Sequence, residues 1–325
     1  MRILFAGSPS IAVPSLEALC GAEGMQVAGV LTNPDSPKGR SGKLCPTEVG
    51  EAAARISRQS AEEGKEAFPI LKPVKLDAPA REEVAALQPD ILVSFAYGKI
   101  FGPKFLALFP LGGINVHPSL LPLYRGPAPV QAAILNRDAA TGISIQTLAR
   151  EMDSGDILAR EEVALTGRET AGTLGEIMAR KAPALLLKTL EGVKSGKSSP
   201  EPQDHGKAGY CSLITREDAL IDWRRGAWDI DAAVWAYNPW PLARTSHNEK
   251  DLYILKASVY GGREIATSSG GKPGAILGID KEAGILVQTG DGILAVAELQ
   301  YQAKKALDWR AFLNGARGFT VSKLG

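Results

Sequence analysis

The stretch that decides the fold class is RILFA at residues 2–6, an apolar run that ends at Gly7. Such a run is typical of a strand that is buried on both faces of a sheet. A helix is expected over residues 11–20, and a second apolar run, QVAGVL at residues 26–31, predicts another strand. This β-α-β order predicts an α/β domain with a mostly parallel, Rossmann-like sheet and helices on both of its faces.

The same alternation continues through the first half of the chain. Strands are expected at residues 90–96, 114–116 and 143–148, and helices at residues 81–87 and 170–190. Ligands of such sheets bind at the carboxyl ends of the strands. We therefore expect the chemistry in the segments that follow the last two of these strands.

A second domain is indicated by a change of composition. Residues 192–209 contain Ser, Gly, Pro and Lys with almost nothing apolar, which is typical of an interdomain linker. After a helix expected at residues 228–236, short β-like runs alternate with Gly-rich turns at residues 252–259, 274–277, 284–289 and 292–299. This pattern predicts a small antiparallel β-barrel of OB type, a fold that serves both structural support and binding. The expected division is a first domain over residues 1–193, a linker over 194–209 and a second domain over 210–325.

The composition is that of an ordinary globular chain. Its 325 residues are 45% hydrophobic and 22% charged, and the formal net charge is +1. Because nucleic-acid-binding proteins usually carry a strong basic excess, any such contact must come from local patches. Three widely spaced cysteines favour a reducing compartment over a disulfide framework or a zinc site. With no long apolar run and no signal-peptide pattern, we expect no membrane span and a cytoplasmic location.

The segment GINVHPSLLPLYRG, residues 113–126, carries the strongest functional signal. Asn115 lies two residues before His117 at the end of an expected strand, so both side chains leave the same face. An amide and an imidazole side by side suit a carbonyl oxygen that becomes negative during nucleophilic attack. The competing interpretation is a structural histidine whose hydrogen bonds are satisfied at a strand end.

A carboxylate is needed to tune this imidazole. The polar segment EMDSGD, residues 151–156, follows another expected strand and offers Asp153 and Asp156. Either one is a candidate to raise the pKa of His117 and keep it protonated, and a solvated turn is the alternative.

Other chemistries fit the pattern less well. One His with an Asp, without a second spaced His or Cys, is a poor zinc site, so no metal is expected. A hydrolase with Ser119 as nucleophile lacks the G-x-S-x-G elbow. The turn after Gly7 lacks the glycine fingerprint of a dinucleotide site.

The loop NPDSPKGRSGKLCP, residues 33–46, carries Lys38, Arg40 and Lys43 among Gly, Ser and Pro. From composition alone, a mobile solvated loop is favoured over a basic finger that binds phosphates.

The stretch NVHPSLLPLYRG, residues 115–126, resembles the signature of the folate-dependent formyltransferases. The opening residues 2–19 and the continuation at residues 126–158 are similar to that family as well. Shorter similar stretches are SFAYGKI, IDW, NPWP and TGDGIL, at residues 94–100, 221–223, 238–241 and 289–294. The resemblance therefore covers nearly the whole chain.

The resemblance implies transfer of a formyl group from 10-formyltetrahydrofolate to the α-amine of initiator methionyl-tRNA, giving N-formylmethionyl-tRNA for translation initiation. It implies Asn115, His117 and Asp153 as the catalytic trio, which selects Asp153 over Asp156. No metal is required, and a monomer is expected. A small amine acceptor, such as glycinamide ribonucleotide or a nucleotide sugar, is a rival, but it would not need a second domain or a basic loop. A tRNA-binding protein without catalysis is disfavoured by the intact trio.

The resemblance also implies binding residues. The S-L-L-P motif that contacts folate falls on Ser119, Leu120, Leu121 and Pro122. The family's basic loop, which reaches the tRNA acceptor stem, falls on residues 33–46, with Lys38, Arg40 and Lys43 as candidate contacts and Arg40 first among them. The C-terminal barrel is implied to help bind tRNA.

The chain departs from the family at the position directly after the S-L-L-P motif. Leu123 stands where the family often has a basic residue, and Arg125 is a candidate to supply that charge.

Overall fold

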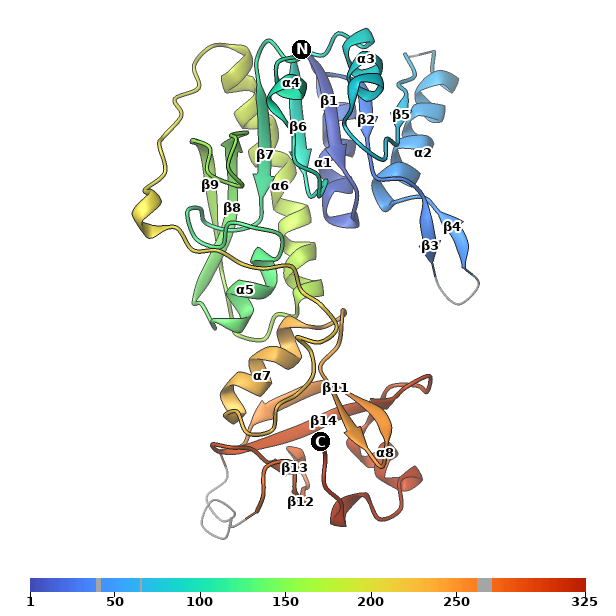
Figure 1. Ribbon diagram of the computed structural model, residues 1–325, viewed down its shortest axis with the longest axis vertical. Coiled ribbons are helices and arrows are strands. Elements are labelled where there is room, and N and C mark those ends of the chain that lie inside the picture. The colour runs from blue at the N-terminus through green and yellow to red at the C-terminus, as the bar shows by residue number, and fades with distance from the viewer. Residues whose placement is uncertain (39–41, 65, 262–270) are drawn as a thin grey trace. The chain divides into compact units, whose positions relative to one another are not determined.

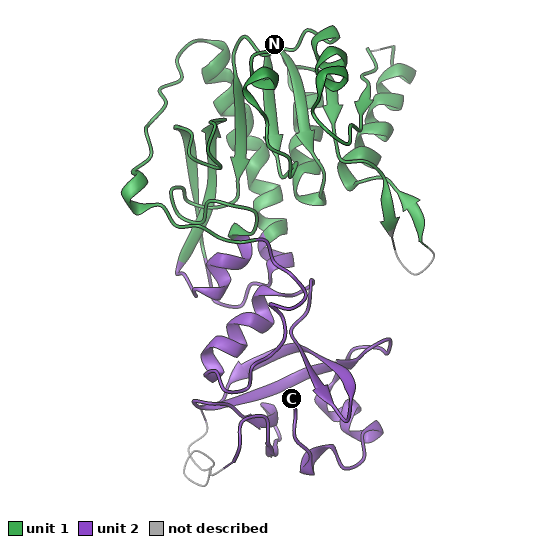
Figure 2. Ribbon diagram, in the orientation of Figure 1, with its two compact units in different colours: residues 1–129, 140–164, 175–212 green, residues 130–139, 165–174, 213–325 purple. Residues whose placement is uncertain are grey.

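The computed structural model describes residues 1–38, 42–64, 66–261 and 271–325 (Figure 1). The chain divides into two compact units (Figure 2). Unit 1 comprises Met1–Pro129, Ala140–Ala164 and Gly175–Ser212, and unit 2 comprises Val130–Ala139, Leu165–Leu174 and Leu213–Gly325. The residues expected to form a linker, 194–209, thus lie within unit 1.

Unit 1 contains a seven-stranded sheet with the strand order β5-β2-β1-β6-β7-β8-β9. Strands β5, β2, β1, β6 and β7 run parallel, whereas β8 and β9 are antiparallel to their neighbours. The strands are β1 (Arg2–Gly7), β2 (Gln26–Leu31), β5 (Ile70–Leu71), β6 (Ile91–Phe95), β7 (Gly113–His117), β8 (Ala140–Thr147) and β9 (Ile157–Ala164). The predicted mostly parallel sheet is confirmed.

Strands β1, β2 and β6 are buried on both faces, as their apolar runs predicted. The helices of unit 1 are η1 (Ser10–Ala12), α1 (Val13–Gly21), α2 (Glu48–Glu62), α3 (Ala78–Ala86), α4 (Pro103–Leu106), η2 (His205–Lys207) and most of α6 (Ala171–Lys194). On one face of the sheet, Leu4 and Leu92 pack in a cluster with Val84 of α3 and Phe105 of α4. The neighbouring Ile3 points to the other face and is also fully buried.

The basic segment forms a hairpin instead of the loop expected from composition. Strands β3 (Ser36–Lys38) and β4 (Lys43–Cys45) pair antiparallel in a sheet of their own. At the base of the hairpin, Asn33 Nδ2 donates to Ser8 Oγ (3.0 Å) and to the carbonyl of Tyr97 (2.9 Å). These bonds attach the hairpin to the carboxyl ends of β1 and β6.

Unit 2 contains an antiparallel sheet with the order β10-β11-β14-β13-β12, and β15 pairs with β14. The strands are β10 (Arg244–His247), β11 (Lys250–Val259), β12 (Ile276–Asp280), β13 (Gly284–Gln288), β14 (Ile293–Tyr301) and β15 (Leu307–Asp308). The other elements are α5 (Pro129–Leu135), α7 (Ala227–Ala236), α8 (Trp309–Gly315) and η3 (Phe319–Val321). One core cluster unites Trp223, Ile254, Val296 and Phe312. The predicted C-terminal antiparallel β-structure is confirmed.

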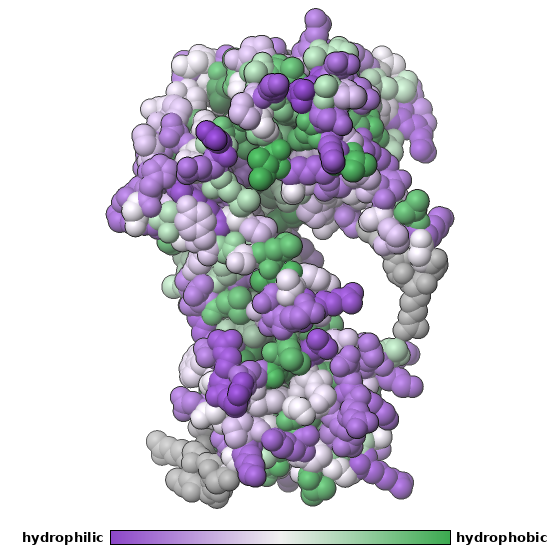
Figure 3. Space-filling view, in the orientation of Figure 1, coloured by the Kyte–Doolittle hydropathy of each residue, from purple (hydrophilic) through white to green (hydrophobic). Residues whose placement is uncertain are grey.

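The surface mixes hydrophilic and hydrophobic residues on the face shown in Figure 3. Exposed large apolar side chains include Leu123 and Met152. Within the described ranges, no helix is both long and apolar enough to cross a membrane.

Candidate active site

Strand β7 places Asn115 and His117 on one face of the sheet. The alternate residues Ile114 and Val116 are buried on the other face, as the alternation of a strand requires. Across the antiparallel pair with β8, Asn115 lies opposite Gln146 and His117 lies opposite Ser144. Directly opposed residues share a face, so Gln146 joins the two predicted residues.

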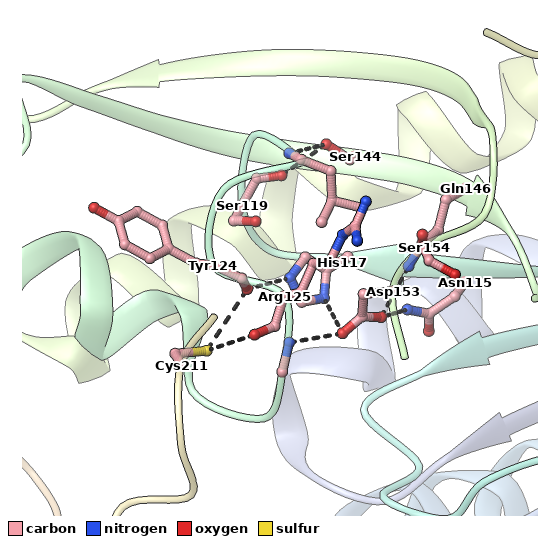
Figure 4. A network of polar contacts seen from close by, with 12 residues as sticks. Asn115, His117, Ser119, Tyr124, Arg125, Ser144, Gln146, Asp153, Ser154 and Cys211 are labelled. Carbon is pink, nitrogen blue, oxygen red and sulfur yellow. Dashed lines mark hydrogen bonds and ion pairs between the residues drawn. The ribbon is translucent and has the colours of Figure 1, made fainter. Parts of the chain in front are cut away.

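Asp153 completes this polar cluster (Figure 4). Its Oδ1 accepts hydrogen bonds from Gln146 Nε2 (2.8 Å) and Asn115 Nδ2 (3.3 Å), and its Oδ2 accepts one from the backbone N–H of Gly126 (2.8 Å). The same Oδ2 lies 3.6 Å from His117 Nδ1. The structure therefore brings Asp153 to His117, the aspartate that the resemblance implied, whereas no such contact joins Asp156 to the ring within the described residues.

The His117 imidazole is almost completely buried, with 4% of its surface exposed. Its Nε2 lies 2.9 Å from the carbonyl oxygen of Tyr124. A carbonyl only accepts hydrogen bonds, so Nε2 carries a hydrogen and the second nitrogen, Nδ1, faces Asp153.

Asp153 raises the pKa of His117, as expected of a nearby carboxylate, but the net shift is downward, so the expectation that the ring stays protonated is not met. Burial lowers this pKa below 6.5, and the opposite effects of Asp153 and of the Tyr124 carbonyl offset it only in part. The sequence placed a carboxylate near the ring but gave no measure of how deeply the ring is buried. Burial thus favours the neutral imidazole, whose Nε2 carries the hydrogen and whose Nδ1 lone pair faces Asp153.

The S-L-L-P motif forms the loop that follows β7. Ser119 is buried and its Oγ donates to the carbonyl of Leu123 (2.6 Å), while the backbone N–H of Leu121 donates to Ser144 Oγ (3.0 Å). Leu121 is buried as well, and Leu120 and Pro122 are half-buried. Because Ser119 bonds to Leu123 and His117 to Tyr124, the geometry gives no support to the serine hydrolase alternative.

Arg125 does not supply the charge that Leu123 lacks. Its side chain is 1% exposed, and its donors reach Gln203 Oε1 (2.7 and 3.2 Å), Tyr210 Oη (3.2 Å) and His205 Nδ1 (3.0 Å). These partners hold the guanidinium inside unit 1. The suggestion that Arg125 takes the place of the basic residue that the family often has at position 123 is thus wrong.

Gln203 is a part of the site that the sequence did not reveal. It lies in the polar stretch expected to be a linker, yet it is 5% exposed and donates to the carbonyl of Asp153 (2.9 Å). A lone glutamine among Pro, Asp and Ser carries no pattern that distinguishes a buried residue from a solvated one.

Two of the three candidate tRNA contacts lie in the hairpin strands. Lys38 ends β3, Lys43 begins β4 and is exposed, and Arg40 lies outside the described residues. Among all described residues, no group of three or more His, Cys, Asp or Glu side chains could hold a metal ion.

Comparison with known proteins matches both parts of the chain to family models. Residues 1–190 match the formyl transferase model and residues 213–317 match the model of the formyl transferase C-terminal domain. The methionyl-tRNA formyltransferase of Treponema denticola is 48% identical over 319 residues, which cover 98% of each chain.

Solved structures share the fold. HypX from Aquifex aeolicus, in complex with tetrahydrofolic acid, has a TM-score of 0.62 at 17% identity and covers 98% of this chain and 48% of that chain. Methionyl-tRNA formyltransferase from Clostridium thermocellum has a TM-score of 0.52 at 16% identity, covering 81% of this chain and 95% of that chain. The family models and the sequence identity along the full chain establish that this protein belongs to the formyltransferase family.

Proposed function

We propose that this enzyme transfers the formyl group of 10-formyltetrahydrofolate to the α-amine of initiator methionyl-tRNA, giving N-formylmethionyl-tRNA for translation initiation. The observation that carries the proposal is the cluster of Asn115, His117 and Asp153, with their side chains joined within 3.6 Å at the end of β7. Relatives that are named methionyl-tRNA formyltransferases over the full length of the chain support the acceptor.

Asn115 is suited to stabilise the oxyanion. One of its two amide N–H groups points to Asp153 Oδ1, and the other remains to donate to the oxygen of the formyl group. That oxygen becomes negative when the amine attacks the formyl carbon and the new C–N bond forms.

His117 is suited to move the proton. Its neutral Nδ1 takes a proton from the attacking amine, and the carboxylate of Asp153 stabilises the imidazolium that results. When the bond between the formyl carbon and N10 of the folate breaks, His117 returns this proton to N10. A His117 whose pKa is lowered by burial is suited to act as the base, whereas the sequence led us to expect a protonated imidazole beside the oxyanion.

The substrate contacts follow from the loops around this cluster. We propose that the loop of Ser119, Leu120, Leu121 and Pro122 contacts the folate through its backbone and its half-buried Leu120 and Pro122, since Ser119 and Leu121 are buried. The β3–β4 hairpin would reach the tRNA through Lys38, Arg40 and Lys43.

We further propose a catalytic domain over residues 1–193, a connection over 194–209 and a tRNA-binding domain over 210–325. In this proposal the enzyme acts as a monomer in the cytoplasm.

The test is a comparison of acceptors. Purified protein is mixed with 10-formyltetrahydrofolate and either charged initiator methionyl-tRNA, uncharged tRNA or a small amine such as a nucleotide amino sugar. Product is identified by mass spectrometry after hydrolysis of the ester bond that joins the amino acid to the tRNA. Formylmethionine from charged tRNA alone is expected, whereas formylation of the small amine alone would overturn the proposed acceptor.

A further inference from the structure

The chain returns to the catalytic cluster after α6. Glu201 and Ile157 exchange two backbone hydrogen bonds of 2.8 Å, which attach this returning segment to the start of β9. Two residues later, the side chain of Gln203 is buried between the loop after β7 and the loop after β8. The backbone bridge therefore fixes the point from which Gln203 reaches the site.

The two ends of the Gln203 amide meet opposite kinds of partner. Its Nε2 lies 2.6 Å from the carbonyl of Gly155, 2.9 Å from the carbonyl of Asp153 and 3.2 Å from Gln146 Oε1. Its Oε1 accepts from Nη2 and Nε of Arg125 at 2.7 and 3.2 Å. Since a guanidinium only donates and a carbonyl only accepts, a single orientation of this amide fits its neighbours, with its two N–H groups shared among the three acceptors.

The orientation of the Gln203 amide also determines the orientation of the Gln146 amide, which contacts Asp153. Gln146 accepts from Gln203 through Oε1, so its own Nε2 must point to Asp153 Oδ1, which it does at 2.8 Å. The permanently charged Arg125 thus determines, through two glutamine amides, that a donor faces the catalytic carboxylate.

The backbone of Asp153 also depends on this contact. Its φ of +52° lies in the left-handed region, which residues with a side chain rarely adopt unless their surroundings hold them there. Gln203 holds the carbonyl of this residue and that of Gly155, two residues on. The carboxylate can then reach Gly126 and His117 at the same time.

We infer that Gln203 is a positioning residue for catalysis: it holds the Asp153 loop and orients Gln146, and thereby places the Asp153 carboxylate against His117. This inference rests on the proposed formyl transfer for its kinetic readout. The inference gives a role in the chemical step to the polar segment between the two regions matched by family models, residues 1–190 and 213–317.

Two variants test the inference. Gln203→Glu keeps an acceptor for Arg125 but replaces the amide donor to Asp153, Gly155 and Gln146 by a second acceptor oxygen. Gln203→Met removes the amide without adding a charge. In both, kcat for formyl transfer is expected to fall roughly 10- to 100-fold, because small misplacements of a catalytic group cost this much. KM for charged tRNA is expected to stay within about twofold, since no substrate contact is lost.

The matched control is Glu201→Gln, the reverse carboxyl-to-amide exchange two residues away. Its carboxylate is exposed and contacts Arg160 (3.1 Å), so kcat is expected to be unchanged. Melting temperatures of all variants show whether any loss of kcat follows from unfolding.

A second measurement does not depend on activity. The chain has three histidines, so NMR of protein with labelled histidine can follow the titration of His117 directly. In Gln203→Met the pKa of His117 is expected to fall below that of the wild type, because a displaced Asp153 raises it less.

Unchanged kcat in folded Gln203→Glu, or an unchanged His117 titration in Gln203→Met, would overturn the positioning role. A wild type that formylates no acceptor would instead refute the proposed function, and the NMR titration would still decide the role of Gln203.

Discussion

Replacement of Asp153 by Asn is the sharpest perturbation of the site, because it removes a charge and changes almost no volume. Oδ1 faces two donors and Oδ2 faces one, so the new amide is expected to keep its oxygen at the Oδ1 position. The new NH₂ group then points to His117 Nδ1, the atom that must take the proton. It also leaves the N–H of Gly126 without an acceptor.

The magnitude follows from the geometry. An imidazolium at 3.6 Å from the carboxylate gains about 4 to 5 kcal/mol at an effective dielectric constant of about 20. Each 1.36 kcal/mol is about tenfold in rate, so its loss is expected to lower kcat by roughly 1000-fold. The unpaired N–H of Gly126 adds a loss of stability of about 1 to 3 kcal/mol.

Single-turnover formylation with excess enzyme, stopped by acid at short times, measures this effect on the chemical step. The matched control is Asp156→Asn, whose carboxylate has no contact with His117 in the described structure, and its rate is expected to be close to that of the wild type. A folded Asp153→Asn variant within about tenfold of the wild type would refute the reasoning, because the charge would then contribute less than about 1.4 kcal/mol.

Three further predictions follow from the same contacts. Because burial keeps the pKa of His117 below 6.5, an NMR titration of the free enzyme is expected to show His117 gaining its proton only below pH 6.5; a midpoint above 6.5 would contradict this. Leu123 is exposed, so Leu123→Arg is expected to lower KM for charged tRNA and to steepen its salt dependence by about one phosphate contact, with kcat unchanged; a salt slope equal to that of the wild type would count against a nearby phosphate. Arg125→Lys is expected to destabilise the protein by about 1 to 3 kcal/mol in urea unfolding, since an ammonium cannot reach Gln203, His205 and Tyr210 together; an unchanged midpoint would show that these bonds contribute little.

Much of the fold was predictable because its strands carry simple patterns. Residues 3–6 and 27–31 are apolar on both faces, and the structure buries them within a parallel sheet. The edge strand β9 was missed, because only Ile157 and Val163, near its two ends, are buried and its middle is charged. Helix α2 was missed as well, because most of its residues are polar and its buried positions are mostly Ala, Gly and a single Val.

The site was predictable only where its residues share a strand. Asn115 and His117 are two positions apart on β7, and period-two geometry is enough to place them together. Asp153 was left open against Asp156 until the family resemblance was considered, because a loop conformation such as its positive φ leaves no pattern in the residues before it. Gln203 was missed, since it reaches the site from 50 residues further along the chain.

The measurement that tests the central claim most directly is formyl transfer from 10-formyltetrahydrofolate to charged initiator methionyl-tRNA, with the wild type beside His117→Ala at equal concentrations. The account predicts rapid formylation by the wild type and a loss of at least roughly 100-fold in the folded variant, as expected when the group that takes the proton is removed. Equal rates for the two proteins would contradict the assignment of the base, and an inactive wild type would contradict the function itself.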